Sequence, residues 1–356
     1  MNENSADYKK GRGSQVNTSS KFLKNALVQG EPEGVDEPLH QTIITQFIEE
    51  YPKKVVNKVE SPDVGMMYSL NPYQGCEHGC IYCYARNTHQ YWGYSAGLDF
   101  ESKIIVKPDA PRLLEKFLNN KNREPAPITL SGNTDCYQPA EKKYKLTRQC
   151  LEVMLKYKHP VGFITKNSLI LRDLDLLSEM AKLKLVKVMV SITSLDEKLR
   201  LKLEPRTATA TKRLNVLNEL SKAGVSCGVM TAPIIPGLNS MEIPALIRAA
   251  ADNGAVMAGF TIVRLNGEIG PIFEDWIHKA FPDKAKKVLS LIKQCHGGTL
   301  NDSRWGTRMM GDGNIAQSIE QLFRTSVKKY MHNPPPYDYD FNIFEKPNKN
   351  KQLELF

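Results

Sequence analysis

The residues with the clearest chemical potential are three cysteines in one short run. Cys76, Cys80 and Cys83 follow the spacing C-x3-C-x2-C, with Tyr82 directly before the third thiol. Thiolates are the soft ligands that iron–sulfur clusters require, and three of them on one loop can bind three irons of a cubic 4Fe–4S cluster. No fourth cysteine lies nearby in the sequence, so the fourth iron would stay open for a small molecule. An open iron indicates chemistry at the cluster, whereas four cysteines would indicate electron transfer.

The same run also fits a structural zinc site. The ligands would then be Cys76, Cys80 and Cys83, with His78 or His89 as the fourth. Zinc sites more often pair two short cysteine knuckles, whereas the other four cysteines of this chain are scattered singly. The odd total of seven cysteines and the lack of a recognisable signal peptide predict free thiols and a reducing cytoplasm.

The residues around the cysteines resemble the radical S-adenosylmethionine (SAM) superfamily, and within it the branch related to spore photoproduct lyase. The segments that carry the resemblance are NPYQGCEHGCIYCYAR, LSGNTDCYQP, ITKN, VSITSLD and LEPRTATATKRL, between about Tyr68 and about Lys329. The resemblance implies that the open iron binds the amino and carboxylate groups of SAM. It implies that the reduced cluster cleaves SAM to methionine and a 5′-deoxyadenosyl radical, which abstracts hydrogen from a substrate. An electron donor such as flavodoxin or ferredoxin would supply the reducing equivalent.

The resemblance also implies cofactor-binding roles for side chains in and after the loop. Tyr82 would pack near the adenine of SAM. Ser131, Asn133 and Thr134 stand after a predicted strand, in a turn that would hold the SAM amino group. The same composition suits an ordinary Asx-rich turn, so the position after a strand is what favours a functional role.

Four further residues have two interpretations each. Lys166 and Ser191 each stand at the end of a predicted strand, and the resemblance implies that they contact the SAM carboxylate and ribose. A buried lysine needs an anionic partner of this kind. The alternative is a solvated lysine in a loop. Arg206 could bind a carboxylate in a fork or pair with Glu204. Cys136 is the catalytic candidate, because spore photoproduct lyase uses a cysteine near this strand to return hydrogen to its product. Its position differs from that pattern, and a small buried residue is the alternative.

Glycines and aromatic residues could support this chemistry. Gly75 and Gly79 would allow positive φ in the loop and bring backbone N–H groups toward a cluster. Trp305 and Arg308, in the Gly- and Arg-rich segment Gly297–Gly313, could stack on a base of a nucleic acid.

The fold prediction is α/β. From Met66 onward, short apolar runs alternate with helical patterns, which is typical of βα units and a parallel sheet. The principal strands are expected at 67–70, 128–130, 161–165, 186–192, 225–232 and 257–263, with an extra strand at 102–106. Helices are expected at 146–158, 171–183, 212–223, 243–253 and 273–294. With the resemblance, six strands imply a partial (β/α)6 TIM-like barrel with N- and C-terminal extensions, and chemistry at the C-terminal strand ends.

The expected organisation has four parts. They are a polar, partly disordered arm at 1–60, the radical SAM partial barrel at 61–270, a helical extension at 271–332, and a linker at 333–356 that ends in the peptide QLELF. In the arm, the segment GRGSQVN could contact a phosphate through its glycines and Arg12, or be a flexible tail.

The charge of the chain bears on its substrate. The formal net charge is +9, and residues 61–330 hold 37 Lys and Arg against 26 Asp and Glu. The excess therefore lies in the body, which suits binding of DNA or RNA phosphates, although many cytoplasmic enzymes are basic. No apolar stretch is long enough to cross a membrane, so we expect no membrane partner.

The terminal peptide suggests a partner. Gln352, Leu353, Leu355 and Phe356 resemble the motif by which bacterial replication and repair proteins bind the sliding clamp. Apolar residues at the end of a polar linker can anchor in a groove. The sequence thus favours a radical SAM enzyme acting on nucleic acid, in DNA repair or modification. The alternatives are the same chemistry on a peptide or small molecule, and a non-enzymatic, metal-stabilised binding module recruited to the clamp.

Overall fold

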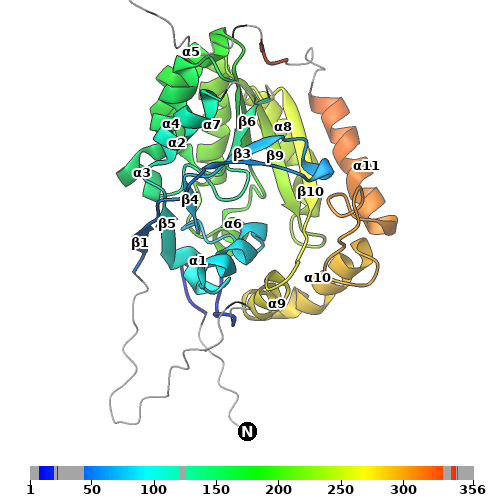
Figure 1. Ribbon diagram of the computed structural model, residues 1–356. Coiled ribbons are helices and arrows are strands. Elements are labelled where there is room, and N and C mark those ends of the chain that lie inside the picture. The colour runs from blue at the N-terminus through cyan, green and yellow to red at the C-terminus, as the bar shows by residue number, and fades with distance from the viewer. Residues whose placement is uncertain are drawn as a thin grey trace, which may run out of the picture.

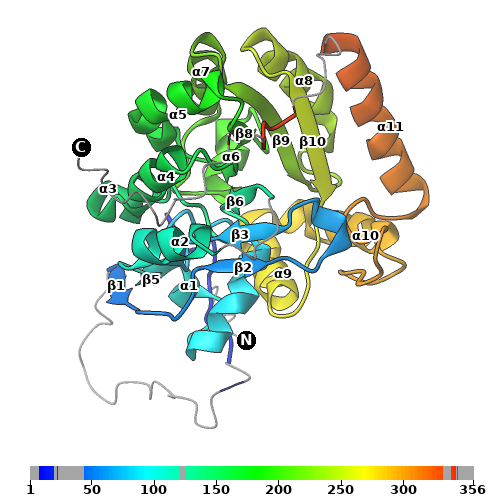
Figure 2. The same cartoon turned by 45° about the horizontal axis from the view of Figure 1, so that its top comes forward.

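The computed structural model describes residues 8–19, 22, 44–120, 126–331, 338–341 and 343. Its centre is a seven-stranded sheet (Figure 1). The strand order is β10 (Met257–Ile262), β9 (Ser226–Ile234), β8 (Val186–Ser191), β7 (Val161–Thr165), β6 (Ile128–Leu130), β3 (Tyr68–Leu70) and β2 (Val56–Lys58). β2 pairs antiparallel with β3, and all other neighbours are parallel. In the described part of the chain the edge strands β2 and β10 do not pair, so the barrel is open (Figure 2).

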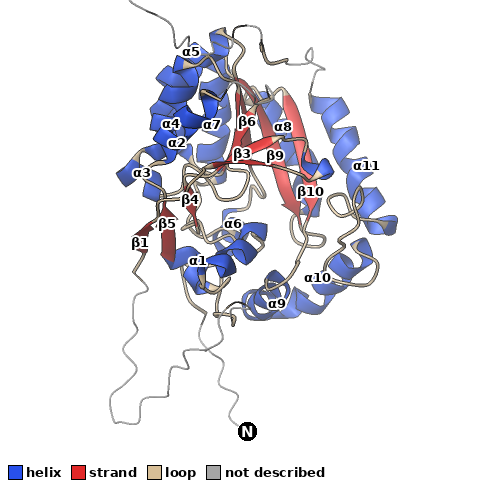
Figure 3. Cartoon of the chain, in the orientation of Figure 1, coloured by secondary structure: helices blue, strands red, loops and turns tan. Residues whose placement is uncertain are grey.

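Helices lie along the outside of the curved sheet (Figure 3). Those that alternate with the strands are α2 (Ala110–Leu118), α4 (Leu146–Lys156), α5 (Leu174–Lys182), α7 (Ala210–Lys222) and α8 (Ile243–Asp252). Shorter ones are α1 (Leu98–Ser102), α3 (Ala140–Tyr144), α6 (Glu197–Leu203), and the 3-10 helices η1 (Pro62–Val64), η2 (Tyr84–Trp92), η3 (Ser168–Asp173) and η4 (Ser240–Glu242). The C-terminal part adds α9 (Ile269–Ala280), α10 (Pro282–Cys295) and α11 (Gly313–Tyr330). A small second sheet has the order β1 (Gln46–Glu49), β5 (Lys103–Val106) and β4 (Tyr73–Gln74).

The main hydrophobic core fills the space between the sheet and these helices. Phe163 of β7, Val188 of β8, Leu217 of α7 and Ile247 of α8 are all buried in it. Burial on one face of each strand and one stripe of each helix explains the period-2 and period-3.6 patterns of the sequence.

The predicted α/β fold and partial barrel are confirmed, and each of the six expected strands is present. The expected helix 171–183 begins as η3 and becomes α-helical only at Leu174. The expected helix 273–294 is two helices, α9 and α10, which break at Phe281. Pro282 lacks a backbone N–H and has a fixed φ, so it suits the first turn of a new helix better than the interior of a continuous one.

The described residues after α11 contact the body of the protein. The Tyr339 hydroxyl donates to the Val161 carbonyl at 3.4 Å, and the Asp340 amide donates to the Lys184 carbonyl at 3.3 Å, both at the N-terminal edge of the sheet. Among the described residues, no helix combines the length and apolar character that crossing a bilayer requires. The terminal QLELF peptide lies outside the described residues.

Candidate active site around the cysteine loop

The cysteine loop follows β3 and the short strand β4, so it lies at the C-terminal edge of the parallel sheet. Gly75 and Gly79 have φ of 74° and 68°, a region where a side chain is strained, as the sequence predicts. A Cβ on Gly75 would also lie 2.8 Å from the Lys103 carbonyl oxygen. Glycine is therefore required for the loop to fold back on the segment Phe100–Lys103.

The three thiols of the loop are brought together. Cys76 and Cys80 are buried and Cys83 is half-buried, and all seven cysteines of the chain are free. Burial raises the pKa of each loop thiol, and the pKa of Cys76 is raised further by Asp135 and by the neighbouring thiols of Cys80 and Cys83. Such thiols ionise when a bound metal supplies positive charge. A set of three adjacent soft ligands without disulfides fits the three-cysteine coordination of a 4Fe–4S cluster.

Side chains from later elements fix the path of the loop. The buried Gln138 amide accepts from the Glu77 amide at 3.2 Å and donates to the Gly75 carbonyl at 3.0 Å, so it contacts the backbone on both sides of Cys76. The Arg86 guanidinium donates twice to the Cys80 carbonyl, at 2.9 and 3.0 Å. The backbone positions of two cysteines therefore depend on residues outside the C-x3-C-x2-C run.

The N-terminal arm also packs on the loop. The fully buried Glu101 carboxylate pairs with Arg86 at 2.5 Å and accepts the backbone amides of Gly13 and Ser14 at 3.1 and 2.7 Å. Arg12 donates to the Glu101 carbonyl at 3.0 Å. The flexible-tail interpretation of GRGSQVN is therefore wrong for these residues, because a buried carboxylate needs the hydrogen bonds that the arm supplies.

His78 has a structural position. Its Nδ1 lies 3.4 Å from Asp135, and its Nε2 lies 3.2 Å from the Asn167 amide. Among the described residues, no three His, Cys, Asp or Glu side chains converge closely enough to hold a single metal ion. In a cubane each cysteine binds a different iron, so the three thiols need not converge on one point.

The turn after β6 is held by its own polar side chains. The Ser131 hydroxyl accepts the Cys136 amide at 2.8 Å, and the Thr134 hydroxyl donates to the Tyr73 carbonyl at 2.6 Å. The Asn133 side chain donates to Thr88 at 3.2 Å. Ser131 and Thr134 are buried and Asn133 is half-buried. These contacts give the turn a fixed shape beside the loop.

Lys166 and Tyr82 face each other at the centre of the site. The Lys166 ammonium lies 5.9 Å from the centre of the Tyr82 ring, and it acts electrostatically on the thiols of Cys80 and Cys83. Within the described residues it forms no ion pair with a carboxylate, although it influences Glu204. A half-buried cation is therefore held near the loop thiols.

Glu204 is a buried anion behind Tyr82. It accepts the Tyr82 hydroxyl, the Thr193 hydroxyl at 2.7 Å and the Arg213 guanidinium at 2.5 Å. Burial alone would raise the pKa of Glu204, but Arg213, Lys166 and these hydrogen bonds lower it to about 2. Arg213 also donates to the carbonyl of the buried Ser191 at 2.7 Å. One ionised network thus connects Tyr82 to the end of β8.

The two remaining candidates are Arg206 and Cys136. Arg206 is exposed, and its amide donates to the His78 carbonyl at 3.2 Å. The alternative pairing of Arg206 with Glu204 does not form, because Arg213 occupies that carboxylate. Cys136 is fully buried in the main core, and burial raises the pKa of its thiol. Its packing is that of a core residue.

The sequence alone missed the buried charges of the site. Glu101, Arg86, Glu204 and Arg213 are each no more than 1% exposed. The sequence does not indicate whether a charged residue is buried, so residues of a fully buried ion pair cannot be distinguished from solvent-exposed ones. The only available signal was the glycine spacing in GRGSQVN, which marks a close backbone approach.

Comparisons with known proteins agree with this geometry. Residues 70–250 match the Radical SAM superfamily. An uncharacterised protein of Mycobacterium tuberculosis is 31% identical over 248 residues, which cover 68% of this chain and 72% of that protein. A Radical SAM Nalpha-GlyT isomerase of Pseudomonas phage M6 is 26% identical over 233 residues, which cover 64% of this chain and 46% of the phage protein.

Among solved structures, the fold is similar to spore photoproduct lyase complexed with dinucleoside spore photoproduct. The TM-score is 0.58 at 18% sequence identity, and the match covers 81% of this chain and 80% of that one. A variant of the same lyase with bound AdoMet gives a TM-score of 0.57. The chain belongs to the radical SAM superfamily, and it is an enzyme that uses a 4Fe–4S cluster and SAM.

Proposed function

We propose that this enzyme abstracts hydrogen from a nucleic acid, in the repair or modification of DNA, and that the site described above carries out the reaction. When bound, the reduced cluster supplies one electron to SAM, whose S–C bond breaks to give methionine and a 5′-deoxyadenosyl radical. In this proposal Cys76, Cys80 and Cys83 bind three irons, and residues 61–270 form the catalytic unit.

The observation that carries the assignment of the SAM site is the position of Lys166. Its ammonium faces the thiols of Cys80 and Cys83 without a carboxylate partner among the described residues, so it can bind the carboxylate of SAM beside the open iron. Tyr82 next to it would contact the adenine, and Ser191 at the end of β8 would contact the ribose. The turn Ser131–Thr134 would hold the amino group through its backbone.

Two observations support a nucleic-acid substrate. The excess of positive charge lies in residues 61–330, with 37 Lys and Arg against 26 Asp and Glu, which favours binding to a phosphate backbone. The fold is similar to that of a lyase crystallised with a dinucleoside. A radical site on this fold is therefore compatible with a nucleoside as hydrogen donor.

The test is anaerobic reconstitution of the full chain with iron, sulfide, SAM and dithionite, followed by incubation with deuterated DNA or RNA. Deuterium in 5′-deoxyadenosine is the expected result. If label comes only from deuterated peptides or small metabolites, the substrate assignment fails while the SAM chemistry stays. The salt dependence of DNA or RNA binding also distinguishes a nucleic-acid substrate from a peptide or small molecule. A slope of log affinity against log salt near zero would exclude phosphate contacts.

We also propose two partners. A one-electron donor such as flavodoxin or ferredoxin would reduce the cluster in the cytoplasm, where free thiols persist. Gln352, Leu353, Leu355 and Phe356 would bind a sliding clamp. Deletion of residues 352–356 tests this second partner alone: unchanged retention on immobilised clamp would exclude it.

A further inference from the structure

An exposed tryptophan lies beside the C-terminal edge of the sheet. Trp305 is 58% exposed and stands in the loop between α10 and α11. A single exposed aromatic side chain is ordinary at a protein surface, so a binding role for Trp305 has to be argued from the groups that hold its ring. Its position relative to β10 decides what it could bind.

The loop that carries Trp305 is fixed to the end of β10. The Ile262 amide donates to the Met309 carbonyl at 2.9 Å, and the Leu265 amide donates to the Leu300 carbonyl at 3.1 Å. These two hydrogen bonds hold the loop against β10, the edge strand of the seven-stranded sheet. Trp305 is therefore placed by the same edge that carries the cysteine loop.

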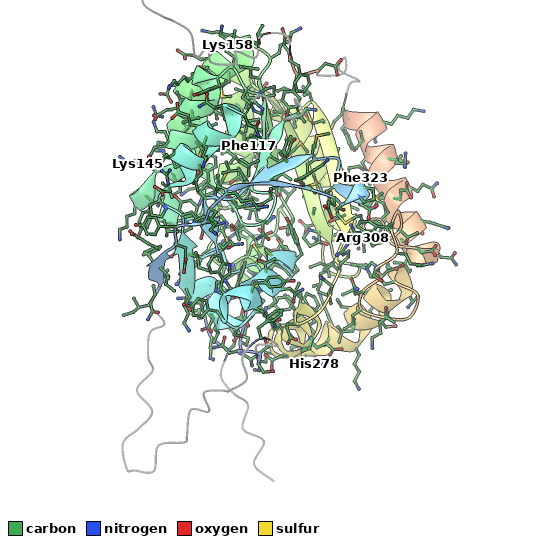
Figure 4. All side chains as sticks on the ribbon, in the orientation of Figure 1. Phe117, Lys145, Lys158, His278, Arg308 and Phe323 are labelled. Atoms are coloured by element: carbon green, nitrogen blue, oxygen red, sulfur yellow. The ribbon has the colours of Figure 1, made fainter. Side chains whose placement is uncertain are left out.

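Arg308 holds the Trp305 ring from one side. Its guanidinium lies 3.8 Å from the ring centre, and it is itself bound to Asp63 at 2.5 Å and to the Ser61 hydroxyl at 2.6 Å. The Gly306 amide donates to the same Asp63 at 3.0 Å. Figure 4 labels Arg308 between the lower end of β10 and α11. One face of the indole is thus covered by a fixed cation, and the exposed area belongs to the remainder of the ring.

Arg264 contacts the loop that carries Trp305. It follows β10, is half-buried, and donates to the Met309 thioether at 3.6 Å, with no carboxylate ion pair among the described residues. Burial, and then the charge of Arg308, lower its pKa, whereas Asp63, Asp302 and Tyr84, which directly follows Cys83, raise it. Because its guanidinium makes no direct carboxylate pair among the described residues, it keeps the capacity to bind a phosphate.

We infer that an unpaired base of a single-stranded nucleic acid stacks on the free face of Trp305 while Arg264 binds a phosphate of the same strand. This inference rests on the proposed nucleic-acid substrate. It specifies that the substrate strand presents an unpaired base next to the reacting nucleotide. Proteins that bind single strands without sequence preference combine aromatic side chains, on which bases stack, with positive charge along the backbone.

The experiment measures binding of a fluorescent oligothymidylate of about eight nucleotides to the full chain, reconstituted anaerobically and mixed with SAM. We expect Trp305→Ala to weaken binding about tenfold or more, and Trp305→Phe to retain part of it, because base–aromatic stacking contributes that much. The matched control is Tyr51→Ala, which removes another exposed aromatic, 63% exposed. Tyr51 follows β1, and β1 lies on the opposite side of the molecule from α10 and α11 (Figure 1).

Salt dependence tests the role of Arg264. Arg264→Gln should reduce the slope of log affinity against log salt by about 0.7, the value for one phosphate of a single strand. Arg264→Lys should keep the slope, and Arg112→Gln, which removes a side chain 66% exposed on α2, should not change it. Iron content and thermal unfolding of each variant show that it is folded.

The outcomes separate the two proposals. Equal affinity of the wild type and Trp305→Ala for the single strand, or binding of duplex alone, would overturn this inference and leave the nucleic-acid substrate in place. If the wild-type chain binds neither single strands nor duplexes of DNA or RNA, the proposed substrate class fails and this inference fails with it.

Discussion

Gly13 of the N-terminal arm lies against the carbonyl oxygen of Gly79 in the middle of the cysteine loop, so closely that a Cβ on Gly13 would overlap that oxygen. The loop is thus enclosed by a segment more than sixty positions away in the sequence. Because the proposed cluster is held by this loop, we expect the arm to shield the cluster from solvent.

Gly13→Ala should therefore displace the arm. We expect the visible absorbance of the reconstituted cluster to decay several-fold faster in air, since oxygen reaches an uncovered cluster more easily. Lys10→Ala is the control, because Lys10 is exposed on the same arm. Equal decay rates for the wild type and Gly13→Ala would show that the arm gives no protection.

Glu101→Gln should destabilise the protein. The Glu101–Arg86 pair is fully buried on both sides, and removal of one partner leaves an uncompensated buried charge, which costs about 3–5 kcal/mol. Anaerobic urea unfolding measures the change. Asp109→Asn, which breaks the exposed pair with Arg112, should have no measurable effect, and a loss of similar size in both variants would contradict the role of burial.

Cys76→Ala should abolish cluster binding. With two thiols left, the proposed coordination loses one of its three protein ligands, so iron content and SAM cleavage under dithionite should fall to background. Cys150→Ala changes a buried thiol in the main core and should retain both. The assignment of the cluster loop is falsified if Cys76→Ala keeps a full complement of iron and cleaves SAM.

Glu204→Gln should weaken SAM binding without loss of iron. The carboxylate positions the Tyr82 hydroxyl and neutralises Arg213, so its removal should let the ring move and raise the KM for SAM several-fold. Thr193→Val is a milder variant that removes one hydrogen bond to the same carboxylate. Glu219→Gln, at the surface of α7, is the control. The change in the electron paramagnetic resonance spectrum on adding SAM reports the site, and an unchanged SAM titration would contradict this role.

Lys107 gives the stability a dependence on pH. Burial lowers its pKa from 10.5 to about 8, and its ammonium donates to the Asn71 carbonyl at 3.1 Å. The cost of the buried charge is fully present below pH 8. Between about pH 8 and 10.5 the unfolded chain keeps a proton that the folded chain has lost, so the free energy of unfolding should rise with pH, by at most ~3 kcal/mol. Lys107→Met should lose this rise, which unfolding at several pH values measures; a rise of the same size in the variant would assign it to another group.

The sequence by itself determined the cysteine loop, the α/β class and the six strands. C-x3-C-x2-C is a local pattern, and Gly75 and Gly79 within it are required by local backbone angles. Strand and helix periods are also local, because burial of one face repeats along each element. For the same reason the sequence placed Lys166 and Ser191 correctly at the ends of β7 and β8.

The tertiary structure alone decided which charges are buried and what they bind. Glu101 accepts hydrogen bonds from the backbone amides of the arm. Glu204 pairs with Arg213 and accepts the Tyr82 hydroxyl rather than pairing with Arg206, its neighbour in sequence. Partners of a buried charge are selected by geometry across distant segments, and no period or motif records them. The free energy of such pairs depends on desolvation, which exists only once the chain has folded around them.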